Sequence, residues 1–191
     1  MSKVEISPAI APFPKPIALV GSSIDGKPNF MNIAWINRMN RSPNIIAASI
    51  NTKHYTLEGI RQNGCFSINF PGTGLVERTD YVGLVSGRDV DKSSVFKVFY
   101  GELEGAPMIE ECPVCMECSV LQYVELPDHV IVLGEVLRLY TEEKYMTDGA
   151  LDPKKMDPIV FTRPGPIGTY WHLGEAVAQA WSVGKRLKEN G

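Results

Sequence analysis

The chain has 191 residues, of which 44% are hydrophobic and 21% charged, with a formal net charge of -3. This length can bury one sizeable core but is short for two ordinary domains, so we expect a single domain over residues 1–191. The mildly acidic balance and the lack of a Lys/Arg run argue against nucleic acid as a partner. Prolines interrupt the stretch where a signal peptide would need apolar residues, and no later stretch approaches a membrane span, so we expect a cytoplasmic protein.

The first third of the chain predicts an extended arm followed by a hairpin. Four prolines within residues 1–16 favour the arm, and a strand over Ile17–Ser23 ends at the turn Asp25-Gly26. The returning strand is predicted at Asn29–Trp35, where alternation puts the side chains of Asn29 and Trp35 on one face. A tryptophan at such a position is equally well explained as a core residue.

The stretch from Ser49 to Phe70 predicts a strand, a polar turn, a helix and a second strand. The apolar run 45–50 indicates a buried strand, and the six residues after it are nearly all hydrogen-bond donors. Thr56 precedes a short helical pattern that Asn63-Gly64 ends. A threonine hydroxyl, a lysine and the free N–H groups of a helix start are how proteins hold a phosphate, although an ordinary polar loop at a helix cap explains the pattern as well.

The rest of the chain predicts further strands with two more helices. Many antiparallel strands with few helices indicate a β-barrel-type domain with helical decoration. The predicted segments are a short helix over 77–83, an exposed polar loop over 86–94 able to reach a neighbouring site, strands over 114–126 and 129–140, a polar linker over 145–158, a strand over 159–161, an irregular aromatic segment over 165–172 and an amphipathic helix over 174–188.

Three of the four cysteines form the run Cys112-Pro-Val-Cys115-Met-Glu-Cys118, whose spacing resembles part of an iron–sulfur ligand set. If the strand begins near Cys112, alternation turns Cys112 and Cys118 to one face and Cys115 to the other, so the thiols do not converge. We therefore favour packing cysteines and expect no metal.

Sequence motifs of several enzyme classes are missing. The chain has no GxGxxG after a strand, no Walker loop, no GxSxG and no HExxH. If the protein is an enzyme, its reactivity is therefore expected to belong to a bound cofactor, and no catalytic residue is assigned.

The ordered combination of several weak motifs resembles the flavin reductase-like family of FMN-binding split barrels, and most of all its flavoredoxin branch. The resemblance covers nearly the whole chain. It rests on Pro16–Val20, Asp25–Asn29, Ala34-Trp35, Ser49–Thr56, Cys65–Asn69, Val85–Lys92, Glu117-Cys118, His129, Gly134–Val136, Tyr170 and Leu173–Glu175. Ser93-Ser94 departs from the pattern, since an aromatic residue is expected after Lys92.

The resemblance implies a mainly β fold with helices, a Greek-key FMN-binding split barrel that forms a homodimer with FMN near the interface. By position, Thr56 and Lys92 would hold the FMN phosphate, with Ser49, Asn51 and Lys53 lining the same loop. It also implies that four further residues contact the ring or ribityl part or lie close to it: Asn29, Trp35, His129 and Phe161.

The implied function is electron transfer from a reduced donor such as NADH or NADPH through FMN to an acceptor. Hydride transfer to a flavin needs positioning more than protein acid–base groups, which agrees with the missing catalytic motifs. Two alternatives stay open: a flavin electron carrier that serves a protein redox partner, and a flavin-binding or purely structural barrel. The mild net charge favours the enzyme, because carriers that dock electrostatically often bear a strong patch of one sign.

Overall fold

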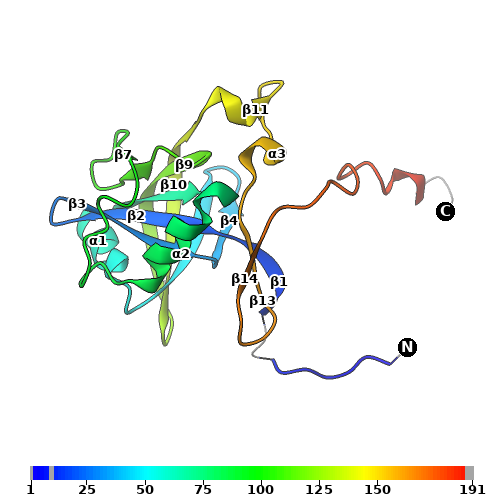
Figure 1. The fold of residues 1–191 in the computed structure, drawn as a ribbon, viewed down its shortest axis with the longest axis horizontal. Coiled ribbons are helices and arrows are strands. Elements are labelled where there is room, and N and C mark those ends of the chain that lie inside the picture. Colours follow the sequence, from blue (N-terminus) through cyan, green and yellow to red (C-terminus); the bar gives the residue numbers. More distant parts are fainter. Residues whose placement is uncertain (1, 9–10, 188–191) are drawn as a thin grey trace.

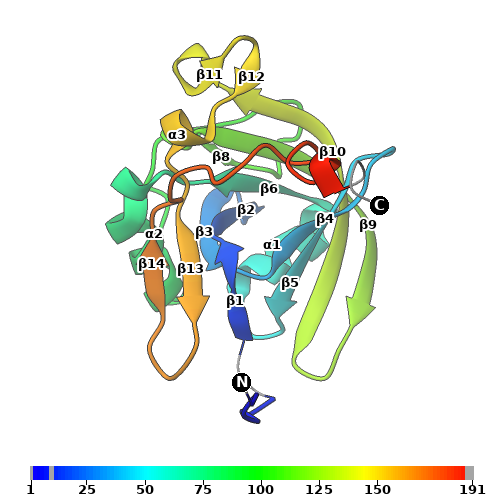
Figure 2. The ribbon, with the colours of Figure 1, turned by 90° about the vertical axis from the view of Figure 1, so that its right-hand side faces the viewer.

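A seven-stranded antiparallel sheet forms the body of the protein, whose computed structural model describes residues 2–8 and 11–187. The sheet order is β3-β2-β6-β9-β10-β5-β4, and the strands curl around helix α1, Tyr55–Asn63 (Figure 1 and Figure 2). In chain order the strands are β2 (Ala18–Ile24), β3 (Lys27–Ile33), β4 (Ile36–Asn40), β5 (Ile45–Asn51), β6 (Cys65–Phe70), β9 (Val114–Glu125) and β10 (His129–Thr141).

Smaller elements flank this sheet. A three-stranded sheet of order β1-β13-β14 joins the proline-rich segment near the N-terminus to the last third of the chain. The smaller strands are β1 (Ala11–Pro16), β7 (Val98–Phe99), β8 (Met108–Ile109), β11 (Met146–Thr147), β12 (Ala150–Leu151), β13 (Val160–Arg163) and β14 (Thr169–Trp171). The other helices are α2 (Val76–Leu84), α3 (Pro153–Met156) and the 3₁₀ turns η1 (Thr73–Leu75), η2 (Glu143–Tyr145) and η3 (Lys185–Leu187).

Two apolar cores lie on opposite faces of the main sheet, because successive side chains of a strand point to opposite faces. Val20 of β2 belongs to the core inside the curl, where Leu57 and Ile60 of α1 also pack. Its neighbour Leu19 belongs to the outer core beneath α2 and β7–β8. Central strands are therefore buried on both faces, and β6 buries the polar side chains of Ser67 and Asn69 as well as its apolar ones.

Several predicted elements are confirmed. The turn between β2 and β3 has Asp25 and Gly26 at φ 51° and 75°, as a two-residue hairpin requires. Gly64 ends α1 at φ 62° and donates its N–H to the carbonyl of Ile60 over 2.9 Å. The long hairpin β9–β10 and the helix α2 lie where the sequence predicts them.

Two local predictions differ near the site. Strand β3 ends at Ile33, so Trp35 lies beyond it, and β4 follows at once, a strand that the sequence analysis did not predict. Helix α1 begins at Tyr55, before Thr56 rather than after it. Thr56 is therefore inside the first turn, and its hydroxyl accepts a hydrogen bond from the side-chain amide of Asn29 over 2.7 Å.

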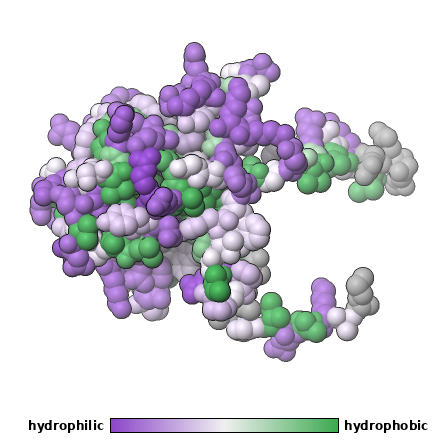
Figure 3. All heavy atoms as spheres, in the orientation of Figure 1, coloured by the Kyte–Doolittle hydropathy of each residue, from purple (hydrophilic) through white to green (hydrophobic). Residues whose placement is uncertain are grey.

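The predicted amphipathic helix over 174–188 is wrong for the residues that the structure describes, with Lys188 lying outside them. Residues 173–187, which we call the C-terminal arm, leave the body as turns and one short 3₁₀ segment (Figure 1). The expected stripe has nothing to pack on, since Val177 is 99% and Trp181 96% exposed. An isolated helix of this length is marginal in water, so the stripe alone does not form one. Apolar residues are visible along both terminal segments in Figure 3.

The four cysteines are free and buried, but their predicted orientation is partly wrong. Cys112 precedes β9 rather than starting it, so it packs with Cys115 in the outer core while Cys118 faces the inner core. Within residues 2–8 and 11–187, no three His, Cys, Asp or Glu side chains are placed to hold a metal ion. Over the same residues, no helix is both long and apolar enough to cross a membrane.

Candidate functional site

A polar pocket of about 300 Å³ lies between the start of α1, the end of α2 and strand β3. It brings together five of the nine predicted site residues: Asn29, Asn51, Lys53, Thr56 and Lys92. Its other lining residues are Met31, Asn32, His54, Tyr55, Val82, Gly83, Leu84, Val85, Ser86 and Gly87. Since the lining has two lysines, a histidine and no carboxylate, the pocket favours an anion.

Lys92 is the most informative residue of the polar pocket. It is only 4% exposed, and its ammonium donates to the carbonyls of Phe30 over 3.1 Å and Val82 over 2.8 Å. An ammonium has three N–H donors, so one is left for a ligand. Burial lowers the pKa of Lys92 to about 8, and no carboxylate pairs with it within the described residues. A buried cation without a counter-ion is stabilised by a bound anion.

The start of α1 supplies further donors to the same pocket. The first N–H groups of a helix have no partner within the helix, and the helix dipole adds partial positive charge there. The side chain and the backbone carbonyl of Asn51 fix the approach to α1, accepting from the N–H groups of Lys53 and His54 respectively, each over 3.0 Å. Because the Thr56 oxygen already accepts from Asn29, its own hydrogen is free to donate to a ligand.

His54 also lines the polar pocket, and the sequence analysis missed it as a site residue. Its pKa is lowered, first by burial and then by the positive charges of Lys92 and His129. Burial is also what lowers the pKa of Lys92. The signal in the sequence was its place in the donor-rich turn between β5 and α1.

An apolar groove of about 570 Å³ lies beside the polar pocket and contains two more predicted residues, Trp35 and Ser49. Its other lining residues are Ala11, Phe13, Lys15, Ala34, Ile36, Asn37, Met39, Ala47, Val124, Ile131 and Leu133. Trp35 is 49% exposed and stacks on the ring of His129, with ring centroids 4.7 Å apart. The ammonium of Lys15 lies 5.5 Å from the Trp35 ring. Flat aromatic surfaces beside an apolar floor suit a planar ring ligand.

Strand β5 joins the two cavities. Ala47 and Ser49 line the groove, and Asn51, the next residue on the same face, lines the polar pocket. Two residues along a strand span roughly 7 Å. Asn51 also pairs with His129 of β10, which carries the stack with Trp35. An elongated ligand with an anionic end and a flat apolar end can therefore lie along one strand face.

Asn29 and Phe161 lie apart from where the resemblance put them. Asn29 lies in the polar pocket with Thr56, rather than at the ring end with Trp35. Phe161 of β13 is not among the described residues that line either cavity. It pairs with Lys15 of the neighbouring strand β1, and the centroid of its ring lies 5.7 Å from that of Tyr170. It lies one strand away from the groove, and its role as a site residue stays a prediction.

Residues 85–92, which we call the 85–92 loop, contribute one wall of the polar pocket. The sequence predicted an exposed loop over 86–94 able to reach a neighbouring site, and the resemblance assigned Lys92 within it to the phosphate. A Cβ on Gly87 would come within 2.1 Å of the Asn29 side-chain oxygen and 2.9 Å of the Tyr55 ring. A glycine is therefore required for this close approach. Such a requirement depends on a long-range contact, and so a single sequence does not reveal it.

Known proteins resemble this chain over most of its length. Two solved structures of flavoredoxins align closely: that from Methanosarcina acetivorans is 44% identical with a TM-score of 0.94, covering 98% of this chain and 100% of its own. That from Desulfovibrio vulgaris (Miyazaki F) is 32% identical with a TM-score of 0.86, covering 96% and 100%. An FMN-binding protein from Thermus thermophilus shares the fold, with a TM-score of 0.79 at 23% identity, covering 94% and 98%.

Sequence comparison gives a consistent result. An uncharacterized protein of Aeropyrum pernix is 28% identical over 156 residues, which is 78% of this chain, and the chain spans only 59% of that relative's length. The flavin reductase like domain matches residues 10–162. The expected mainly β split-barrel fold is confirmed by these matches. This chain belongs to the flavin reductase-like domain family, and flavoredoxins are among its solved relatives.

Proposed function

We propose that the protein is an FMN-binding flavoprotein of the flavin reductase and flavoredoxin type, transferring electrons from a reduced donor such as NADH or NADPH to an acceptor. The observation that carries this proposal is the buried charge of Lys92, which lacks a carboxylate partner among the described residues and faces the free end of α1. A terminal phosphate supplies the missing negative charge. The apolar groove one step along β5 suits the flavin ring.

Each part of the site has a role in holding FMN. Lys92 and Thr56 would donate to the phosphate, with Lys53 adding charge at the rim and Asn29 fixing the Thr56 hydroxyl. Ser49 and Asn51 would face the ribityl chain, and Trp35 with His129 would contact the ring. When bound, FMN supplies the acceptor for a hydride or for single electrons.

The chain's own contribution to the reaction is positioning and the exclusion of water. The groove walls are almost entirely apolar, and Lys15 is the only charged residue among those described that line the groove. A nicotinamide ring can stack in such a groove before it gives up a hydride. This favours the enzyme over the electron-carrier alternative, which needs only an exposed flavin edge.

Anaerobic mixing distinguishes the two functions. NADH or NADPH is expected to bleach the absorbance of the bound flavin near about 450 nm, an optical property of the cofactor itself. If neither donor bleaches it while a reduced electron-transfer protein does, the protein is a carrier. A protein that binds no flavin would be a structural barrel.

We also propose a homodimer, in which the N-terminal and C-terminal segments lie across the partner. The exposed apolar side chains Val4, Ile6, Val177 and Trp181 support this, because they lie on segments that leave the body (Figure 1). Both segments extend from the side that bears β1, a strand lining the apolar groove (Figure 2). A two-fold pair would bring the same face of each copy together and bury these residues.

A further inference from the structure

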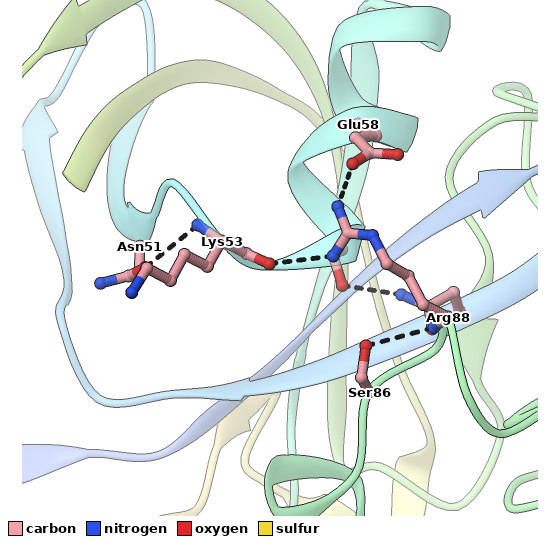
Figure 4. A network of polar contacts seen from close by, with 7 residues as sticks. Asn51, Lys53, Glu58, Ser86 and Arg88 are labelled. Atoms are coloured by element: carbon pink, nitrogen blue, oxygen red, sulfur yellow. Dashed lines mark hydrogen bonds and ion pairs between the residues drawn. The ribbon is translucent and has the colours of Figure 1, made fainter. Parts of the chain in front are cut away.

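Arg88 joins the two walls of the polar pocket (Figure 4). It comes from the 85–92 loop, and its guanidinium donates to the carbonyl of Lys53 over 3.0 Å and to the carboxylate of Glu58 on α1. The same guanidinium lies 5.0 Å from the centre of the Tyr55 ring. One side chain therefore connects the loop to Lys53, two residues before α1, to the first residue of α1 and to its first turn.

These contacts fix the backbone that forms the anion site. The peptide between Lys53 and His54 is held on both sides, its carbonyl by Arg88 and its N–H by the carbonyl of Asn51. The carboxylate of Glu58 pairs with Arg88, on the side of the loop. Glu58 is not among the described residues that line the polar pocket. Arg88 itself does not line that pocket, so it acts by positioning rather than as an anion ligand.

A second pocket, the outer pocket, lies on the far side of this connection. It has a volume of about 370 Å³ and shares Asn29, Tyr55, Gly87 and Lys92 with the polar pocket. Its other lining residues are Ile24, Asp25, Lys27, Pro28, Arg88, Asp89, Val90 and Asp91. The shared residues form the partition between the two pockets. Arg88 follows Gly87 in the chain and lies over the ring of Tyr55, so it connects the loop that carries Gly87 to Tyr55.

The charges on the two sides of the partition differ. The polar pocket has no carboxylate in its lining, whereas the outer pocket has three aspartates. Hydrogen bonds from the side chain and backbone of Ser93, followed by the contact with Lys27, lower the pKa of Asp91 to about 2, so this carboxylate is ionised at neutral pH. The outer pocket also contains Lys27, which pairs with Asp91 over 3.2 Å, and Arg88, which pairs with Glu58. A second phosphate that passed through the partition would therefore meet cations that are already paired with carboxylates.

We propose that Arg88 closes the phosphate end of the flavin site and restricts the ligand to a mononucleotide. The inference rests on the proposed function, since it concerns the same site. In a dinucleotide such as FAD, the flavin phosphate carries a further phosphate and an adenosine, which would have to cross the partition into the outer pocket. Arg88 is thus a specificity-determining positioning residue: it selects FMN against FAD without contacting FMN.

The test compares FMN, FAD and riboflavin binding to the full chain and to Arg88→Ala by quenching of flavin fluorescence. The full chain is expected to bind FMN at least about 100-fold more tightly than FAD, and Arg88→Ala is expected to reduce this ratio about tenfold, the scale of one ion pair with a ring contact. Riboflavin affinity is expected to change less than about twofold, because its ribityl chain ends before the partition.

Arg61 gives a matched control at the other end of α1. It also pairs with a carboxylate, that of Glu125 over 2.6 Å, and lies over a ring, that of Tyr123 at 5.4 Å, with similar exposure. Arg61→Ala is expected to leave the FMN-to-FAD ratio unchanged. Arg88→Lys, which keeps the charge but loses the two-pronged contact, is expected to lower the ratio by an intermediate amount.

A second readout needs no flavin. Hydrogen exchange of the flavin-free protein is expected to be faster in residues 85–91 and 53–57 of Arg88→Ala than in the full chain, with no such change in Arg61→Ala. Unchanged exchange, or an unchanged FMN-to-FAD ratio while FMN still binds tightly, overturns the role of Arg88 alone. Wild-type protein that binds FAD as tightly as FMN also overturns it. Wild-type protein that binds none of the three flavins overturns the proposed function together with it.

Discussion

Lys92 determines how the site responds to pH. Its pKa in the folded protein is about 8, below its ordinary 10.5. Between these two values the unfolded chain binds more protons than the folded one, so the stability of the flavin-free protein rises with pH across that window. Below it both states are protonated, and the folded protein carries the full cost of the buried charge. A bound phosphate offsets that cost only while Lys92 is protonated.

The affinity for FMN is therefore expected to fall above about pH 8, approaching tenfold per pH unit, while the affinity for riboflavin stays nearly flat. The measurement is flavin fluorescence quenching between about pH 7 and about pH 9.5. Lys92→Met removes the titrating group and is expected to remove the difference in slope between the two ligands. An equal slope for FMN in the variant and the natural protein would assign the pH dependence to another group.

At the level of elements, the loop of residues 85–92 must approach β3 and α1 closely to form the polar pocket. Gly87→Ala is expected to weaken FMN binding at least about tenfold, because a Cβ would collide with Asn29 and push the loop away from Thr56. Gly74→Ala is the control, since nothing lies within 4 Å of a Cβ at that glycine. Titration with FMN and thermal unfolding of both variants check this. Equal FMN affinity in the two variants would contradict the close approach.

The elements that the sequence predicts well are those fixed by local signals. Strand alternation, the Asp25-Gly26 turn and the end of α1 at Gly64 are all determined by neighbouring residues, and the donor-rich turn before α1 indicated the place of the polar pocket. The misplaced features depend on distant contacts. Trp35 leaves its predicted strand to stack on His129, some ninety residues later. The C-terminal stripe has helical spacing but no surface of its own chain to cover.

At the level of the whole molecule, the C-terminal arm has apolar side chains, Val177 and Trp181, that the body of the same chain does not cover. Deleting residues 177–191 is expected to convert the proposed dimer into a monomer, because it removes Val177 and Trp181, which the partner subunit would cover. The truncation is expected to change the unfolding temperature of the monomer itself only a little, since these two side chains are almost fully exposed in the single chain. Light scattering after size exclusion measures the mass. A full-length chain that is monomeric at micromolar concentration would contradict the proposal.

The polar pocket around Lys92 and Thr56 is proposed to hold the phosphate of FMN. Comparing FMN and riboflavin affinities in the natural protein and in the double variant Thr56→Val, Lys92→Ala tests this role. We expect the natural protein to prefer FMN by at least about 100-fold, the scale of two hydrogen bonds to a charged group. In the variant this preference is expected nearly to disappear, because the lost contacts are to the phosphate, which riboflavin lacks. An equal loss of affinity for both ligands, or a natural protein that binds neither, would contradict it.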